Sequence, residues 1–256
     1  MVATQVELPR RVIRNEVLLV LGVSLGASAI WATLRIIERL TRVEALADQT
    51  AALNRSATPD RPWLDLIWQL TGIGLAVVPV LLALYLLNRR PGDGPRLIGL
   101  DLRRPRQDLA SGAALTALIG LPGLALYLAA YELGLSVQIA PANLPPVWWA
   151  VPVLILAALQ NSLVEEVVGV GYLLTRLREL GWHPAVAVGG HALLRGTYHL
   201  YQGFGGFVGN AVMGVVFALF FLRFRRVMPL VVAHTALDVA AFVGYALLRD
   251  DLSWLP

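Results

Sequence analysis

About seven apolar stretches dominate this sequence, and each is long enough to cross the roughly 30 Å hydrocarbon layer of a bilayer as a helix. The chain of 256 residues is 57% hydrophobic and only 15% charged, and its mean hydropathy of +0.66 lies well above that of soluble globular domains. The sequence therefore predicts an all-α fold, a polytopic membrane helix bundle of about seven transmembrane helices in a lipid bilayer. The predicted spans are residues 16–37, 64–87, 109–131, 148–173, 185–203, 206–222 and 228–248.

All 21 basic residues are Arg, and most of them lie just before the first apolar stretch and in the loops after the second, fourth and sixth. Because short basic loops stay in the cytoplasm, this pattern predicts a multi-pass cell-membrane protein with a cytoplasmic N-terminus. The Arg residues form no basic stripe interleaved with aromatic residues, so nucleic acid is not an expected partner. These loops hold Arg10, Arg11, Arg14, Arg89, Arg90, Arg96, Arg103, Arg104, Arg106, Arg176, Arg178, Arg223, Arg225 and Arg226.

The chain divides into three parts. Residues 1–147 hold the first three spans and an Arg-rich cytoplasmic loop, residues 148–248 form a membrane core, and residues 249–256 are a short C-terminal tail. A polar linker at 40–62 and a Pro-rich segment at 134–147 are expected as loops on the non-cytoplasmic side.

The N-terminal sequence and the absence of cysteine limit which kinds of protein and site are possible. Ala27-Ser28-Ala29 has the form of a signal-peptidase site, but the apolar run continues through Ile36, so a retained first helix is favoured. The chain has no Cys, which excludes disulfides, thiolate metal sites and a cysteine nucleophile.

Ionisable residues interrupt the apolar sequence mainly in the membrane core. A charged group near the bilayer centre costs about 2.5–3.5 kcal/mol, so such groups need partners or a water-filled cavity. Four-residue spacings place some of them on common helix faces, and three helices could direct polar groups at one centre. The residues are Glu165, Glu166, His191, Arg195, His199, His234 and Asp238.

Local geometry refines this expectation. Glu165 and Glu166 are adjacent and about 100° apart around a helix, so we expect one to serve a site and the other a neighbour. The glycines at 189–190 are expected to end a cytoplasmic segment, so that the fifth helix begins near His191, which is assigned a structural use. Tyr198 is expected to pack at an interface.

The carboxylates and histidines of the membrane core suit peptide hydrolysis. A carboxylate and a His can deprotonate a water, while a second His donates a hydrogen bond to the oxyanion. The sequence has no His-Glu-x-x-His zinc helix, no paired Gly-x-Gly-Asp aspartates and no Gly-x-Ser-Gly nucleophile turn.

Three stretches of the core carry a resemblance to a known family. Glu165-Glu166-Val167-Val168-Gly169-Val170, Arg195-Gly196-Thr197-Tyr198-His199 and His234-Thr235-Ala236-Leu237-Asp238 resemble the motifs Glu-Glu-x-x-x-Arg, Phe-x-x-x-His and His-x-x-x-Asn/Asp of the CPBP family. This family contains the glutamate intramembrane proteases typified by the CAAX prenyl protease Ras-converting enzyme, with bacterial abortive-infection and bacteriocin-processing relatives. The resemblance covers residues 148–248.

The resemblance implies a role for each matching position. Glu165 and His199 would activate water, His234 and Asp238 would stabilise the oxyanion, and Glu166 would be a supporting carboxylate. The implied activity is a membrane-embedded endopeptidase of glutamate type, acting on a membrane-associated protein or peptide near the cytoplasmic face, without a metal or another cofactor. Asn210, among small residues, is a supporting candidate.

Three positions depart from the motifs. Val170 stands at the motif Arg and Arg195 at the motif Phe, so we expect Arg195 to supply the missing cation from the next helix and to pair with Glu166. Asp238 stands where an amide is common, and an ionised carboxylate cannot donate to an oxyanion. Asp238 is therefore either protonated or orients His234.

Other classes stay open at this point. The altered motifs allow a non-catalytic CPBP-fold scaffold or immunity regulator, and intramembrane carboxylates and histidines also build ion-coupled transporters. A metal hydrolase using Glu165, His199, His234 and Asp238 is a further alternative. The substrate and the oligomeric state are not determined by the sequence.

Overall fold

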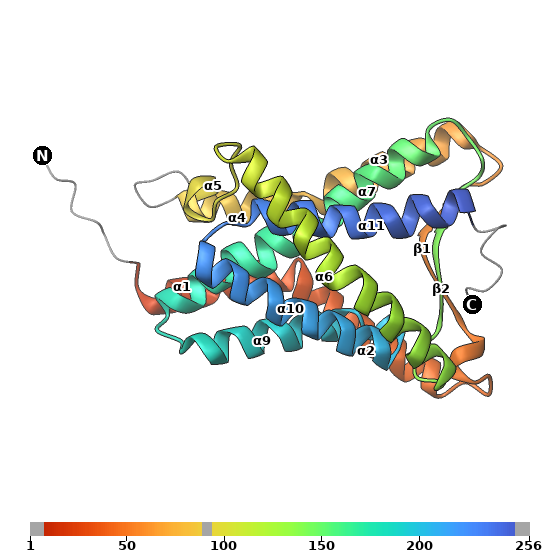
Figure 1. Cartoon of the computed structure of the whole chain (residues 1–256), viewed down its shortest axis with the longest axis horizontal. Coiled ribbons are helices and arrows are strands. Elements are labelled where there is room, and N and C mark those ends of the chain that lie inside the picture. The colour runs from red at the N-terminus through yellow and green to blue at the C-terminus, as the bar shows by residue number, and fades with distance from the viewer. Residues whose placement is uncertain (1–7, 89–93, 249–256) are drawn as a thin grey trace, which may run out of the picture.

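The computed structural model describes residues 8–88 and 94–248 (Figure 1). The predicted tail at 249–256 and the loop residues Arg89 and Arg90 lie outside this part. In chain order the elements are α1 (Arg10–Gly22), α2 (Leu25–Leu40), η1 (Leu46–Asp48), β1 (Thr50–Arg55), α3 (Pro62–Ala76), α4 (Val78–Asn88), α5 (Gly94–Leu97), α6 (Pro105–Glu132), β2 (Gln138–Asn143), α7 (Ala150–Ser162), η2 (Leu163–Tyr172), α8 (Leu173–Glu179), α9 (Pro184–Tyr198), η3 (Leu200–Gln202), α10 (Phe204–Phe224) and α11 (Met228–Leu248).

The predicted polytopic helix bundle is confirmed, and the protein is a multi-pass membrane protein. Within the described residues, 5 helical segments are long and apolar enough to span a bilayer, or 6 when α1 and α2 are taken as one span bent by 48°. Large apolar side chains such as Leu121 and Trp148 stay exposed on the outer faces, as expected for surfaces in contact with lipid. The count of seven spans is not confirmed, because α9 has 15 residues, about 22 Å of helix.

The prediction for the start of α9 is wrong. The helix begins at Pro184, where the His183 side chain accepts a hydrogen bond from the backbone of Ala185, and Gly189 and Gly190 lie inside it. Proline at the first turn and a capped N-terminus outweigh the roughly 1 kcal/mol that each interior glycine costs. The helix ends early instead, at Tyr198, and this leaves His199 at its C-terminal end.

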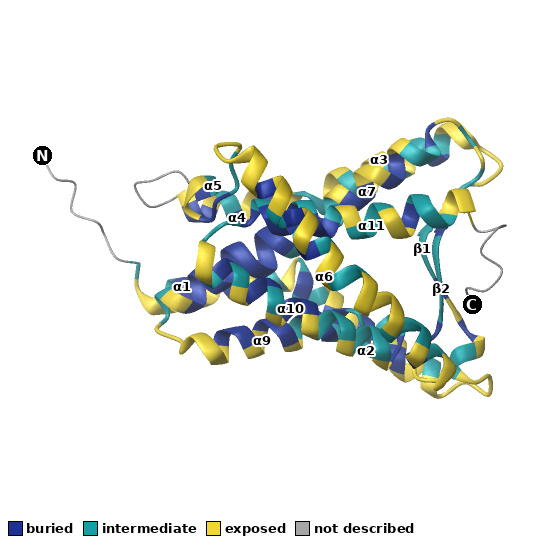
Figure 2. Cartoon of the chain, viewed as in Figure 1, coloured by how far each residue is buried: buried dark blue, intermediate teal, exposed yellow. Residues whose placement is uncertain are grey.

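The segment from α7 to α8 is the centre of the bundle (Figure 2). In the most apolar 18-residue stretch of this segment, 56% of the residues are buried, whereas the value for α6 is 11%. Its middle, η2, is π-helical, which the sequence did not predict, and Val167, Val168 and Val170 are fully buried there. π-helical turns occur frequently at functional sites because they change the direction of successive side chains.

Two segments expected as loops pair as strands. β1 and β2 form a parallel two-stranded sheet in which Thr50 lies opposite Gln138 and Arg55 opposite Asn143. We call the end of the molecule that bears this sheet the sheet end (Figure 1).

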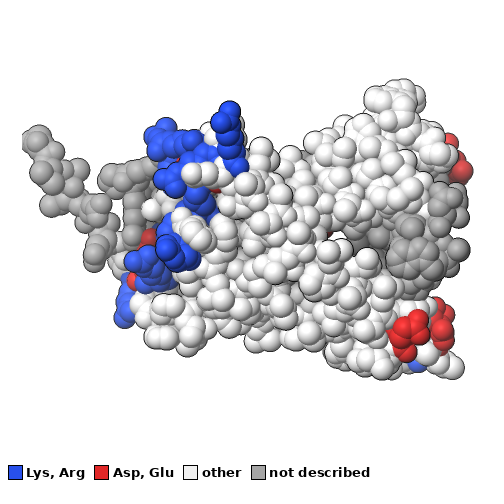
Figure 3. All heavy atoms as spheres, viewed as in Figure 1, with Lys and Arg blue, Asp and Glu red and all other residues white. Residues whose placement is uncertain are grey.

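Charges segregate along the long axis. Figure 3 shows Arg side chains gathered around the beginning of α1 and around α5, which we call the Arg-rich end, and acidic side chains at the sheet end. On the α10–α11 loop, Arg226 binds Asp101 at 3.0 Å and Asp108 at 2.7 Å. The hydrogen bond from Arg226 lowers the pKa of Asp101 below its ordinary value.

The turn that follows His199 depends on Gly203. Its backbone angles are φ 97° and ψ −177°, a combination that only glycine adopts without strain. An added Cβ would lie 2.7 Å from the carbonyl oxygen of Leu135 and 2.7 Å from Cα of Ser136. The amide of Phe204 donates to the same Leu135 oxygen at 2.8 Å, so the loop before β2 holds this turn in place.

We expect Gly203→Ala to lower the free energy of unfolding by about 1–3 kcal/mol, because it adds backbone strain and steric conflict. Thermal unfolding of detergent-solubilised protein measures the change. Gly74→Ala in α3 is the matched control, since no atom lies within 4 Å of the added Cβ. Equal melting temperatures for the two variants would contradict this account of the turn.

Candidate functional site

Arg195 stands at the centre of the ionisable cluster. Its side chain is fully buried, with Nη1 2.8 Å from Oε1 of Glu166 and Nη2 3.2 Å from Oε2 of Glu165. The predicted contact between Arg195 and Glu166 is confirmed. The guanidinium on α9 is the cation for both carboxylates of η2, whereas Val170 stands at the position of the motif Arg.

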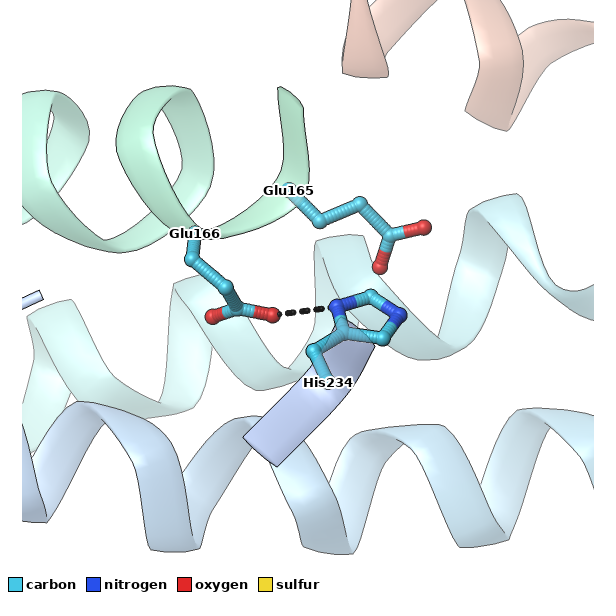
Figure 4. A group of neighbouring side chains, drawn as sticks. All are labelled: Glu165, Glu166 and His234. Carbon is cyan, nitrogen blue, oxygen red and sulfur yellow. Dashed lines mark hydrogen bonds and ion pairs between the residues drawn. The ribbon is translucent and has the colours of Figure 1, made fainter. Parts of the chain in front are cut away.

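Glu165 and Glu166 are neighbours on η2, and their side chains differ in burial and in partners (Figure 4). Glu166 is fully buried, and its Oε1 also lies 2.8 Å from Nδ1 of His234. Glu165 keeps 14% of its side chain exposed. The expectation that only one of them serves an open site agrees with this difference in exposure, although both reach Arg195 because a long side chain can bridge the angle between adjacent positions.

Glu165 and His199 face each other across a short gap. The hydroxyl of Tyr198 donates to Oε2 of Glu165 at 2.9 Å, so this oxygen is held by Tyr198 and Arg195 together. The Nδ1 of His199 lies 3.0 Å from the carbonyl oxygen of Arg195 and must donate to it, which leaves the lone pair on Nε2. That Nε2 is 3.9 Å from Oε1 of Glu165, too far for a direct hydrogen bond but suited to a water that contacts both.

His234 is oriented by two carboxylates. Its Nδ1 donates to Glu166, and its Nε2 points towards Oδ1 of Asp238 at 3.6 Å. The amide of Asn161 donates to the other oxygen of Asp238 at 3.2 Å. Because Asp238 accepts from Asn161 and faces His234, the geometry fits the expectation that Asp238 orients His234 better than it fits a donor to the oxyanion.

These side chains meet in one cavity of about 480 Å³, which we call the site cavity. Glu165, His199, His234 and Asp238 all line it, so four of the five residues predicted as catalytic share one space. Glu166 is not part of this wall, and it contacts one of the lining residues, His234.

Two other polar residues lie apart from the site cavity. Asn210 lines a separate cavity of about 190 Å³ between α6 and α10, and its amide donates to the carbonyl of Gly206. His191 is buried on α9, with its ring facing Gly169, in agreement with its expected structural use. Nothing in the structure places either residue on the cavity wall beside Glu165.

Tyr198 and Asn161 are the residues that sequence reasoning missed. Tyr198 was expected to pack at an interface, yet it holds Glu165, and Asn161 holds Asp238. The available signal was position: Tyr198 directly precedes the motif His, and Asn161 lies four residues before Glu165, on the same helix face.

Three of these residues bring possible metal ligands close together. Ligand atoms of Glu165, Glu166 and His234 lie within 4.8 Å of one another. The guanidinium of Arg195 already contacts both carboxylates, so a divalent ion would have to share this space with a fixed cation. The donor set therefore does not fit a metal ion, and it also differs from the predicted set, which used His199 and Asp238 in place of Glu166.

The helix bundle defines a multi-pass membrane protein, and its central helices carry the three motifs. Residues 147–240 match the family model described as Type II CAAX prenyl endopeptidase Rce1-like. This match confirms the resemblance to the CPBP family. No curated protein and no solved structure matches the chain.

We expect Arg195→Met to destabilise the protein by about 3–5 kcal/mol, because it leaves two carboxylates without their cation in the interior. The double variant Arg195→Met with Glu166→Gln removes one of those charges and should recover part of the loss. Thermal unfolding of the two variants in the same detergent gives the comparison. A double variant no more stable than Arg195→Met would show that the charge balance is not what Arg195 provides.

Proposed function

We propose that this protein is a membrane-embedded endopeptidase that hydrolyses a peptide bond of a membrane-associated protein or peptide with water activated by Glu165 and His199. The observation that carries the proposal is the pair formed by Oε1 of Glu165 and Nε2 of His199, 3.9 Å apart in the wall of the site cavity. Every other polar atom of these two side chains is held by a neighbour, so both free acceptors are directed at one place.

In the first step, a water held between these two atoms loses a proton to Glu165 or His199 while its oxygen attacks the carbonyl carbon of the substrate. Two acceptors on one water fix the direction of its remaining lone pair, and this orientation lowers the barrier to attack. Tyr198 and Arg195 hold the far oxygen of Glu165 and so keep the near oxygen turned towards the water.

The attack moves an electron pair onto the carbonyl oxygen, and His234 is placed to stabilise this charge. Glu166 accepts from Nδ1 of His234, which directs Nε2 into the site cavity, and Asp238 faces that nitrogen. A protonated Nε2 then donates to the oxyanion. Collapse of the intermediate breaks the C–N bond, and the proton taken from water passes to the leaving amine.

The Arg-rich end supports the proposed orientation, with a cytoplasmic N-terminus in a cell membrane. The enzyme would need no cofactor, since the chain's own carboxylates and histidines supply each proton transfer in this sequence. A non-catalytic scaffold or immunity regulator is the second candidate, because Val170 breaks the first motif. The position of Arg195 against Glu166 favours the enzyme, since the lost cation is replaced.

We expect Glu165→Gln and His199→Ala each to lower the rate of cleavage by about 10²–10⁴-fold, the usual contribution of a positioned general base. The assay follows cleavage of membrane-anchored peptides by protein reconstituted in liposomes. The matched controls are Glu38→Gln, an exposed acid on α2, and His183→Ala, a loop residue at the start of α9. Unchanged cleavage by the first two variants would refute the proposal, and a cellular phenotype that survives them would favour the scaffold.

Tyr198→Phe tests the positioning of Glu165. We expect kcat to fall about tenfold with KM unchanged, because a hydrogen bond to a charged group contributes about 1.5–3 kcal/mol and this one holds the base rather than the substrate. Steady-state kinetics with the same peptides separates the two constants. A change confined to KM would show that Tyr198 contacts the substrate instead.

A further inference from the structure

A second cavity, which we call the vestibule, adjoins the site cavity and has a volume of about 700 Å³. One of its walls is β1, through Ala52, Leu53 and Asn54, and another is one face of α2. Leu53 and Ser28 also line the site cavity, together with Glu165. Figure 1 shows β1 and β2 at the sheet end, between α11 and the end of α2. A strand of the protein therefore borders the space beside the candidate catalytic residues.

The backbone of β1 bonds to β2 along one edge. In a parallel pair, alternate residues direct their N–H and C=O groups to the partner strand. The amide of Gln138 donates to the carbonyl of Gln49 at 2.9 Å, so Gln49 and Ala51 face β2. Pro141, the residue of β2 that would otherwise donate to the carbonyl of Ala52, has no N–H. The backbone groups of Ala52 therefore face the other edge of β1.

This other edge is covered at Thr50 and open at Ala52. Arg39 of α2 donates to the carbonyl of Thr50 at 3.1 Å. At Ala52, no group outside the sheet bonds to the backbone N–H or C=O within the part of the chain that the structure describes. The outer edge of β2 differs, because the amide of Ile139 donates to the hydroxyl of Tyr127. Since Ala52 lines the vestibule, the free edge of the sheet lies at the vestibule wall.

A free strand edge is a binding feature for one kind of ligand. An extended polypeptide adds to such an edge as a further strand, because its own N–H and C=O groups recur at the same spacing. A lipid acyl chain offers neither a donor nor an acceptor to this edge. A sheet of two strands is also marginally stable by itself, so a third strand stabilises it. The occupant that this wall favours is therefore a peptide in extended form.

We infer that β1 is a docking strand for the substrate, which pairs in extended form with the N–H and C=O groups of Ala52 in the vestibule and continues past Leu53 into the site cavity. The inference rests on the proposed function and adds how the substrate is recognised. Recognition through backbone groups tolerates many side chains, but it requires an unfolded segment beside the cleaved bond and a free N–H at the paired position. Proline at that position of the substrate is excluded.

The first test changes the peptide. Glu165→Gln protein in nanodiscs of phosphatidylcholine is titrated with the membrane-anchored peptides of the cleavage assay, made fluorescent and carrying one N-methyl group at each backbone position in turn. We expect about tenfold weaker binding where the methyl group replaces the N–H that donates to Ala52. The positions directly before and after should bind as the unmodified peptide does, because their N–H groups point the other way.

The second test changes the strand. Ala52→Pro removes the N–H at the free edge, a place in a sheet where proline is tolerated, so Glu165→Gln/Ala52→Pro should bind the unmodified peptide about tenfold more weakly than Glu165→Gln. The matched control is Glu165→Gln/Ala45→Pro, which should bind unchanged. Ala45 is exposed in the segment before β1, and its φ of −61° suits proline.

A third measurement uses the unaltered strand. In ¹⁵N-labelled Glu165→Gln protein, bound peptide should slow hydrogen exchange at the amide of Ala52 and leave the amide of Ala51 unchanged, because Ala51 already bonds to β2. This readout tests the pairing independently of whether Ala52→Pro folds.

The outcomes separate the inference from the proposed function. Equal binding of all N-methyl peptides, or an exchange rate at Ala52 that bound peptide does not change, overturns the inference and shows that side chains or lipid occupy the vestibule instead. Cleavage by protein with an intact Glu165 would then leave the proposed function standing. Position-dependent loss of binding without any cleavage by that protein overturns the proposed function and leaves β1 as the docking strand of a non-catalytic protein.

Discussion

The buried ion pairs of Arg195 organise the rest of the structure. Two carboxylates on one turn of η2 repel each other and cannot be enclosed together without a cation, and Arg195 reaches both. Its ion pairs link α9 to η2, and its carbonyl oxygen accepts a hydrogen bond from Nδ1 of His199. The charge balance of the interior and the geometry of the water-activating pair thus depend on the same residue.

The site is formed where regular helix geometry is interrupted. η2 widens the motif helix into a π-helix, and α9 stops at Tyr198, which brings His199 to the end of a short helix instead of leaving it inside a long span. The loop before β2 then holds the turn at Gly203. The end of α9 leaves His199 with Nε2 3.9 Å from Oε1 of Glu165 in the wall of the site cavity.

Much of the fold could be predicted from the sequence, because the bilayer imposes a length and a composition on every spanning helix. The helices near 109–131, 206–222 and 228–248 agree with α6, α10 and α11 within a few residues. The strands β1 and β2 could not be predicted in this way, since short segments pair according to which helix ends lie beside them. The prediction of the fifth span was wrong for a similar reason, because the apolar sequence continues past Tyr198 but the helix ends there.

The sequence alone determined which ionisable groups are present: two adjacent glutamates, histidines four residues from Arg195 or from Asp238, and an Arg displaced from its motif position to the next helix. It also determined that these groups need one another, because unpaired charges at bilayer depth are costly. Only the tertiary structure decided how they pair. It left Glu165 facing the site cavity and Glu166 enclosed, it assigned Tyr198 and Asn161 as partners, and it left Asn210 elsewhere. The physical reason is that hydrogen bonds and ion pairs depend on distances between helices, which sequence spacing along one helix does not contain.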